Sequence, residues 1–232
     1  MSRAALLFDV DGTLADTLGA GKAALSAAMT EVCGETGPVD DFDFHGRTDP
    51  EIVRGLLRSA GWADDDVDGT LPALWPAYLA RLQTELDARA GRSRALDGVP
   101  VLLARVAADD RFACGLVTGN LEAGARLKLT AIGCAEWFGF GGYGSDAEER
   151  DLLPAVALAR AAERFGSPFA PERSVVIGDT PADIRCARAA GARVLAVATG
   201  RHGADELAAH QPDAVFENLG DADRVLEFFL DG

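Results

Sequence analysis

The stretch Leu6–Leu14, LLFDVDGTL, decides the fold that we expect for this chain. Ala4–Val10 is short, apolar and followed by turn-forming residues, a pattern that predicts a buried β-strand. Asp9 then lies near the carboxyl end of this strand. Because ligands of open α/β sheets bind outside the carboxyl ends of the strands, Asp9 is the first candidate site residue.

Asp9 and Asp11 are so close in sequence that their negative charges repel each other. A divalent cation such as Mg²⁺, which prefers oxygen ligands, relieves this repulsion, and so does a proton on one carboxylate. An ionised Asp9 can then act as a nucleophile and a protonated Asp11 as a general acid. The alternative is a plain Asx turn after a strand. A calcium-binding loop is excluded, since Gly12 comes too early and Ala20 replaces the bidentate glutamate.

The composition is that of a folded, acidic protein with one large domain or two small ones. The 232 residues are 48% hydrophobic, with a formal net charge of −15 and a pI of about 4.5. This charge disfavours nucleic acid and anionic membranes as partners, but not a small phosphorylated metabolite that meets local cations. The N-terminus matches neither a signal peptide nor a membrane span, and the scattered cysteines predict reduced thiols. We therefore expect a cytoplasmic protein.

The elements expected after the first strand fall into two groups. The first group is helical: a helix from Asp16 or Thr17 to about Cys33, then Glu51–Ser59, an acidic linker Asp64–Gly69, and a helix over about Leu71–Ala90. Farther along, strands alternate with helices, which predicts a doubly wound parallel sheet of the Rossmann-like α/β class. The helical block is too large for a crossover loop. We therefore expect a core of residues 1–16 and 92–232, with residues 17–91 inserted as a helical cap.

Three of the expected strands end in polar sequences, namely FDVDGT, LVTGN and VIGDTPAD. A parallel sheet brings these strand ends to one edge. Asp179 ends a strand, and Asp183 follows one helical turn later, so both can join Asp9 and Asp11 in a cation site made of oxygen ligands. The alternative for Asp183 is a solvated acid in the first turn of a helix, where the helix dipole favours it.

The second of these strand ends offers groups for an anion. Thr118 provides a hydroxyl, and the backbone amides of Gly119 and Asn120 can face an anion at the start of a helix. The alternative is that these residues only cap that helix.

The sequence also resembles a known family. DVDGT at Asp9–Thr13, the threonine that follows an apolar strand at Thr118, and GDTPAD at Gly178–Asp183 resemble the motifs of the haloacid dehalogenase-like hydrolase superfamily. The order and spacing match, and the resemblance covers essentially the whole chain. The helical insert is similar to the cap that some members of this family carry after the first motif.

This resemblance implies roles for the site residues and a Mg²⁺ cofactor. Asp9 would attack phosphorus and form an aspartyl-phosphate, while Asp11 would protonate the leaving group and then activate water. Asp9, the backbone carbonyl of Asp11, and Asp179 would hold Mg²⁺, with Asp183 supporting them directly or through water. Thr118 would donate a hydrogen bond to the phosphoryl group.

The family usually supplies one further cation, a lysine ahead of the third motif. No lysine follows Lys128 in this sequence, and Arg150, in DAEERDLLP, stands in the matching region. We assign the role to Arg150, since its planar guanidinium can bind two phosphate oxygens. The alternative is a solvated helix residue that pairs with a nearby glutamate.

The loop FHGRTD, at Phe44–Asp49, is similar to the cap loop that reaches over the active site in phosphoglycolate-phosphatase-like members. Arg47 could then meet a second anionic group of the substrate, and His45 could hydrogen-bond to it. The alternative is a surface loop in which Arg47 pairs with Asp49 or Glu51.

The glycine-rich stretch Gly139–Gly144 satisfies G-x-G-x-x-G but lacks the strand, helix and acidic residue that a dinucleotide site requires. We expect it to be a flexible loop that leads to Arg150.

Together these features predict a Mg²⁺-dependent phosphatase for a small organic phosphate monoester, with phosphoglycolate as a candidate. A phosphoglucomutase-like phosphotransferase and a catalytically silent binding protein on the same fold are the alternatives. We expect a monomer or a homodimer, with hinges for the cap near Asp16–Leu18 and Ala90–Ala95.

Overall fold

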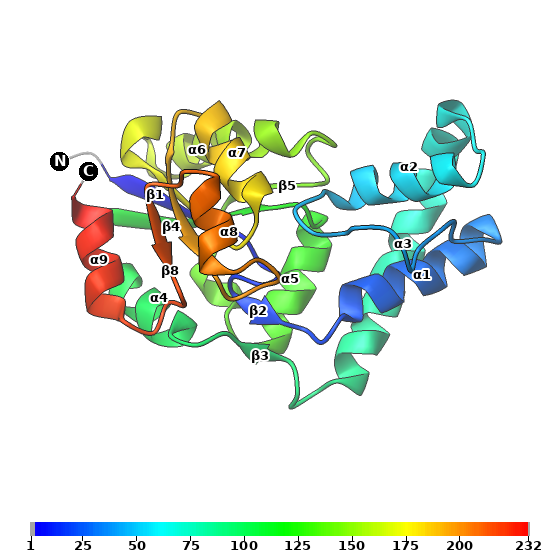
Figure 1. The fold of residues 1–232 in the computed structure, drawn as a ribbon, viewed down its shortest axis with the longest axis horizontal. Coiled ribbons are helices and arrows are strands. Elements are labelled where there is room, and N and C mark those ends of the chain that lie inside the picture. Colours follow the sequence, from blue (N-terminus) through cyan, green and yellow to red (C-terminus); the bar gives the residue numbers. More distant parts are fainter. Residues whose placement is uncertain (1–2, 232) are drawn as a thin grey trace.

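The structure, a computed structural model, describes residues 3–231 as a six-stranded parallel sheet with helices on both faces and a separate helical insertion (Figure 1). The strand order is β5-β4-β1-β6-β7-β8. These strands are β1 (Ala4–Phe8), β4 (Phe112–Thr118), β5 (Gly141–Tyr143), β6 (Val175–Gly178), β7 (Arg193–Val197) and β8 (Ala214–Phe216). The chain passes from β1 to one side of the sheet and then returns to β6 on the other side. The end of β1 is therefore the switch point at which such sheets bind ligands.

The side chains of β1 alternate between two hydrophobic cores, because successive residues of a strand point to opposite faces. Leu6 and Phe8 pack with α4 (Val99–Ala107), α5 (Glu122–Ala131) and α9 (Ala222–Leu230). Ala5 and Leu7 pack on the other face with α6 (Leu153–Phe165), α7 (Pro181–Ala189) and α8 (Ala204–Ala209). A strand that is buried on both faces reads as a continuous apolar run, and the predicted doubly wound α/β class is confirmed.

The insertion consists of α1 (Ala20–Cys33), α2 (Asp49–Ser59) and α3 (Asp64–Ala88), which share a third hydrophobic core that also includes Leu121, just before α5. Figure 1 shows these three helices standing beyond the carboxyl edge of the sheet, at the opposite end from the chain termini. The two connections to the sheet run side by side, since β2 (Ala15–Asp16) pairs antiparallel with β3 (Arg94–Ala95). The predicted helical insertion after the first strand is confirmed.

Two predicted boundaries of the helical block are wrong. The first helix begins at Ala20 and not at Asp16 or Thr17, because Leu18 and Gly19 adopt left-handed backbone angles that no helix continues. Asp64–Gly69 is not a linker but the first turns of α3, where the acidic residues complement the helix dipole and Val67 is fully buried. Within residues 3–231, no helix has the length and apolar character needed to cross a membrane.

The glycine-rich stretch is also not the flexible loop that we expected. Gly141–Tyr143 forms the edge strand β5, paired with β4, and its residues are buried. A side chain at Gly142 would begin 2.1 Å from the carbonyl oxygen of Leu153. The glycine therefore allows β5 to pack closely against the start of α6.

The two-sided core makes a test of β1 possible. Leu7→Ala should lower the free energy of unfolding by about 2–5 kcal/mol, because it leaves a cavity at a fully buried position. Urea denaturation measures this loss. The matched control is Val101→Ala, at a position that is 59% exposed in α4, which should change the free energy by at most about 0.5 kcal/mol. Equal effects of the two substitutions would contradict the assignment of β1 to the centre of the core.

Candidate active site

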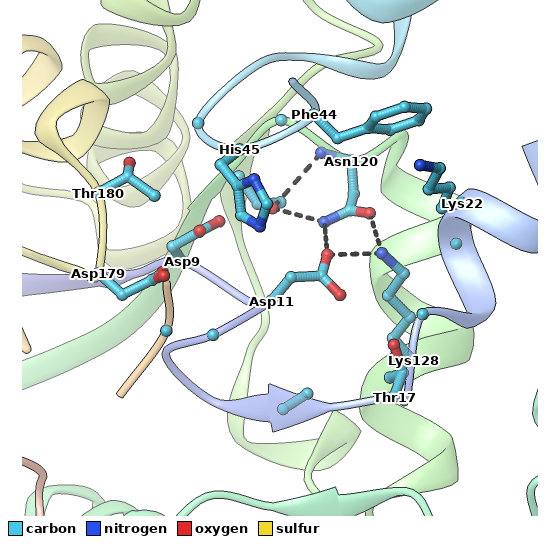
Figure 2. A pocket seen from close by; sticks show the side chains of 18 of the residues that line it. Asp9, Asp11, Thr17, Lys22, Phe44, His45, Asn120, Lys128, Asp179 and Thr180 are labelled. Carbon is cyan, nitrogen blue, oxygen red and sulfur yellow. Dashed lines mark hydrogen bonds and ion pairs between the residues drawn. The ribbon is translucent and has the colours of Figure 1, made fainter. Parts of the chain in front are cut away.

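The carboxyl edge of the sheet carries a cavity of about 590 Å³ between the sheet and the helical insertion (Figure 2). Its lining comes from the ends of β1, β4 and β6, from the 3₁₀ helix η2 (Arg150–Leu152), and from the insertion. Asp9, Asp11, Thr118, Arg150 and Asp179 all face this cavity. The three polar strand ends therefore meet at one edge of the sheet, as predicted.

Three buried carboxylates lie together at the centre of the site. Asp9, Asp179 and Asp183 each offer an oxygen, and these oxygens all lie within 4.8 Å of one another. Thr13 Oγ1 donates a hydrogen bond of 3.1 Å to Asp179 Oδ1. The backbone of Gly12 also approaches Asp179 closely, since a side chain there would begin 2.4 Å from its Oδ2. Asp179 is thus held in place from the strand that carries Asp9.

Arg150 is the cation of this cluster and is 3% exposed. Its Nη2 donates to Asp183 Oδ1 at 2.5 Å and lies 3.3 Å from Asp9 Oδ1. Burial opposes its charge, but the Asp183 and Asp9 carboxylates raise the pKa of the guanidinium above its ordinary range. The Nε atom is buried without a hydrogen-bond partner among the described residues. Arg150 is therefore not a solvated helix residue.

Asp183 is fully buried and has both oxygens engaged by protein donors. Oδ1 accepts from Arg150, and Oδ2 accepts from the backbone N–H of Thr180 at 3.0 Å and from its hydroxyl at 2.6 Å. Asp183 and Thr180 form a reciprocal capping box at the start of α7. The solvated alternative for Asp183 is therefore wrong.

Arg150 alone does not compensate for the burial of the other two carboxylates of the cluster, Asp9 and Asp179. Burial raises the pKa of Asp9 to about 6, although Arg150 opposes the shift and Asp183 adds to it. Burial, together with Asp183 and Asp9, also raises the pKa of Asp179. A divalent cation would stabilise both ionised forms, and a set of carboxylate oxygens suits a hard ion such as Mg²⁺. The residues present therefore fit a magnesium site.

Asp11 is turned away from this cluster, as Figure 2 shows, toward Asn120 and Lys128. Its Oδ2 accepts from Lys128 Nζ at 2.5 Å and from Asn120 Nδ2 at 2.8 Å. Burial would raise the pKa of Asp11, but the Lys128 charge and the hydrogen bonds from Lys128 and Asn120 lower it overall. In this arrangement Asp11 is ionised at neutral pH.

Thr118 and its neighbours join the site through side chains more than through free amides. Asn120 Nδ2 donates to Thr118 Oγ1 at 2.8 Å, and Thr118 is fully buried. The carbonyl of Gly119 accepts from the backbone N–H of Asp49 at 2.7 Å. A side chain at Gly119 would begin 2.0 Å from the Arg47 carbonyl oxygen. The loop after β4 thus lies directly against the insertion.

His45 and Arg47 line the cavity from the insertion, as expected. The Arg47 guanidinium pairs with Glu51, which is the alternative stated above, and its Nε donates to the Asp43 carbonyl oxygen at 3.0 Å. His45 Nδ1 lies 2.8 Å from Asp43 Oδ1. Both side chains are therefore partnered in this structure.

Sequence reasoning missed Lys128 and Asp49. Lys128 is 4% exposed and bonds Asn120, eight residues earlier, as well as Asp11. Asp49, the first residue of α2, accepts a hydrogen bond of 2.8 Å from the backbone N–H of Leu121. Lys128 could have been singled out as a lone lysine in a core helix, two turns after Asn120. No signal in the sequence marks Asp49.

The sequence of this chain matches proteins of a known family. The family model described as HAD-hydrolase-like matches residues 154–222. A phosphoglycolate phosphatase of Xanthomonas campestris is 32% identical over 224 residues, which cover 92% of this chain and 91% of that protein. The chain belongs to the haloacid dehalogenase-like hydrolase superfamily. It is accordingly a hydrolase of phosphate monoesters, as its homologues are.

Solved structures of this superfamily share the fold over nearly the whole length of this chain. A predicted phosphoglycolate phosphatase from Haemophilus somnus superimposes with a TM-score of 0.70 at 20% identity, covering 97% of this chain and 98% of that one. CbbY from Rhodobacter sphaeroides, solved with phosphate, gives a TM-score of 0.65 at 21% identity, covering 94% and 96%. At these identities the likeness bears on the fold alone.

Asp49 gives this hydrolase a testable pH dependence. Burial raises the pKa of Asp49 from 3.8 to about 6, while Lys128 and the Leu121 amide oppose the shift and Asp11 adds to it. Between these pH values only the folded protein holds the proton, so the free energy of unfolding falls as pH rises through that window. The Asp49 contribution is on the order of 3 kcal/mol. Asp49→Asn, which keeps an acceptor for Leu121, should remove it.

Urea denaturation of both proteins at pH 4 and pH 7, with chelator present throughout, measures the difference. Asp9 and Asp179 impose a slope of the same sign in both proteins. The difference between the wild type and the variant in how the free energy of unfolding changes with pH therefore measures the contribution of Asp49. Parallel stability curves would show that Asp49 titrates normally.

Proposed function

We propose that this hydrolase is a Mg²⁺-dependent phosphatase that cleaves a small organic phosphate monoester through an aspartyl-phosphate on Asp9. The observation that carries the proposal is the buried cluster of Asp9, Asp179 and Asp183 around Arg150, in which Asp9, Asp179 and Arg150 line the cavity. A nucleophilic carboxylate at the switch point of a parallel sheet, with a fixed guanidinium beside it, suits attack on phosphorus.

The charges of the site support one divalent cation. Among the four motif aspartates Asp9, Asp11, Asp179 and Asp183 and the two cations that pair with them, Arg150 and Lys128, the negative charges exceed the positive ones by two, which one Mg²⁺ would offset. Asp9, Asp179 and the backbone carbonyl of Asp11 would hold the ion, and Asp183, whose oxygens are occupied, would support Asp179 and Arg150. When bound, Mg²⁺ would neutralise charge on the transferring phosphoryl group.

The proposed reaction has two steps, and side chains of this protein act in both. In the first step Asp9 attacks phosphorus while Asp11 donates its proton to the ester oxygen, and the alcohol leaves. In the second step Asp11 removes a proton from the water that hydrolyses the aspartyl-phosphate, which restores both residues. The phosphate dianion of the substrate opposes the Lys128 charge and favours the protonated Asp11 that the first step needs. Thr118 and Arg150 would hold the equatorial phosphoryl oxygens.

We further propose that residues 17–91 act as a cap over a core of residues 1–16 and 92–232. The paired strands β2 and β3 carry the chain into and out of the insertion, next to the predicted hinges at Asp16–Leu18 and Ala90–Ala95. The insertion is docked on the core, since Asp49 bonds Gly119 and Leu121, and Arg54 Nε donates to Glu148 at 2.8 Å.

The substrate we propose is a small phosphorylated metabolite with a second anionic group, and phosphoglycolate is the candidate suggested by the homologues. Arg47 and His45 would contact that second group after Arg47 leaves Glu51, and the amides of Gly119 and Asn120 would contribute to anion binding. The cavity is larger than phosphoglycolate requires, so bulkier phosphate esters also belong in the panel. A cytoplasmic location and a monomer or homodimer complete the proposal.

Hydrolysis of an aryl phosphate and of phosphoglycolate tests this function. Activity should require Mg²⁺ and fall to background with chelator, and Asp9→Asn should lower kcat by about 10³-fold or more because the nucleophile is lost. The matched control is Asp110→Asn, which removes a fully exposed carboxylate and should leave kcat unchanged.

The alternatives give different outcomes in the same assay. Activity that depends on a sugar bisphosphate would indicate a phosphotransferase. Mg²⁺ binding without turnover of any ester would indicate a silent binding protein. Full activity of Asp9→Asn would overturn the aspartyl-phosphate mechanism.

A further inference from the structure

Lys128 is a buried cation of the site that contacts neither phosphorus nor the leaving group in the proposed steps. Lys22 and Lys128 are the only lysines in the sequence, and Lys128 lies on α5, two turns from the loop after β4. Arg150 already pairs with the acidic cluster, so the cluster does not need Lys128 as its counter-ion. An amino group buried this deeply needs compensating partners, because burial disfavours its charge.

Those partners form a closed triangle, drawn in Figure 2. Lys128 Nζ donates to Asp11 Oδ2 at 2.5 Å and to Asn120 Oδ1 at 2.6 Å. Asn120 Nδ2 closes the triangle with its 2.8 Å bond to the same Asp11 oxygen. We propose that Lys128 is a positioning residue for the acid–base aspartate and, through Asn120, for Thr118. This proposal rests on the phosphatase function given above.

The triangle leaves one Asp11 oxygen free for chemistry. Both donors bind Oδ2, and among the residues that the structure describes Oδ1 accepts no hydrogen bond. An ammonium and an amide on one oxygen fix the rotation of the carboxylate, which a single donor would not do. Oδ1 is thereby left to exchange a proton with the ester oxygen or with water.

The same lysine sets the direction of the Thr118 hydroxyl. Lys128 has no acceptor, so the Asn120 atom that faces it must be the amide oxygen. The Asn120 NH₂ group then faces both Asp11 and Thr118 Oγ1. Since Thr118 Oγ1 accepts this hydrogen bond, its own O–H is free to donate to a phosphoryl oxygen. One ammonium therefore orients both the Asp11 carboxylate and, through Asn120, the Thr118 hydroxyl.

Leaving-group dependence separates this role from a merely structural one. An alkyl phosphate needs a proton on its leaving oxygen, whereas a nitrophenyl phosphate releases a stable anion. Lys128→Met should therefore lower kcat/KM for an alkyl phosphate by about 10²-fold and for nitrophenyl phosphate by less than about 10-fold. Lys128→Gln, which keeps a donor without the charge, should fall between the wild type and Lys128→Met. The control is Arg160→Met, which removes an ion pair with Asp146 outside the cavity and should change neither value.

A double-mutant cycle locates the effect at Asp11. In the background of Asp11→Asn, Lys128→Met should cost less than about 10-fold with the alkyl ester, because the carboxylate that it positions is gone and only the orientation of Thr118 remains to be lost. Equal losses for both esters, or a full additional loss in the Asp11→Asn background, would overturn the proposal.

An NMR spectrum of protein labelled with ¹³C-lysine tests the contact without turnover. The two lysines give two sets of signals, and Asp11→Asn should shift those of Lys128 while those of Lys22 stay in place. Unchanged Lys128 signals would overturn the triangle itself. A wild type that hydrolyses neither ester would instead overturn the proposed function, and the NMR result would still report whether Lys128 holds Asp11.

Discussion

The ion pair between Arg150 and Asp183 is the interaction on which the site depends. It is buried on both sides, so each partner would be costly to leave alone in the interior. Asp183 lies in the first turn of α7, Arg150 precedes α6, and the same guanidinium reaches Asp9 just after β1. One cation therefore fixes the mutual position of three elements that are far apart in sequence. The acidic cluster can be close-packed because this cation lies within it.

The sheet contributes a second constraint, the close approach of the backbone around Asp179. Gly12 has a left-handed backbone conformation and Gly200 lies so near that a side chain there would begin 1.8 Å from Asp179 Oδ2. Thr199 Oγ1 donates a hydrogen bond of 2.6 Å to the Gly12 carbonyl oxygen and ties these two loops together. The carboxylate of Asp179 is confined by backbone on two sides, which pre-organises it for a cation and limits what else can enter.

The sequence predicted the parts of this structure that depend on local patterns. Apolar runs closed by polar residues located β1, β4 and β6, and their parallel pairing brought Asp9, Thr118 and Asp179 together without further information. The beginning of α3 was missed because an acidic run resembles a linker until its aspartates are seen to occupy a first helical turn. Lys128 was missed because its partner Asp11 lies 117 residues away, and only the packing of α5 against the sheet brings them together. Helix periodicity alone describes Lys128 as an ordinary polar residue.

The hydrogen bonds that hold Asp11 come from a different part of the chain than the loop that lines the cavity from the insertion. Among the described residues, every hydrogen bond to the Asp11 carboxylate comes from the core, from Asn120 and Lys128. The insertion bonds the loop after β4 through Asp49, whose backbone N–H donates to Gly119 and whose carboxylate accepts from Leu121. The rotation of the Asp11 carboxylate is therefore set by Asn120 and Lys128, and the insertion comes near this pair through Gly21 of α1, where a side chain would begin 3.1 Å from Lys128 Nζ. His45 and Arg47 line the same cavity from the insertion, and among the described residues their side chains bond Asp43 and Glu51 and not Asp11.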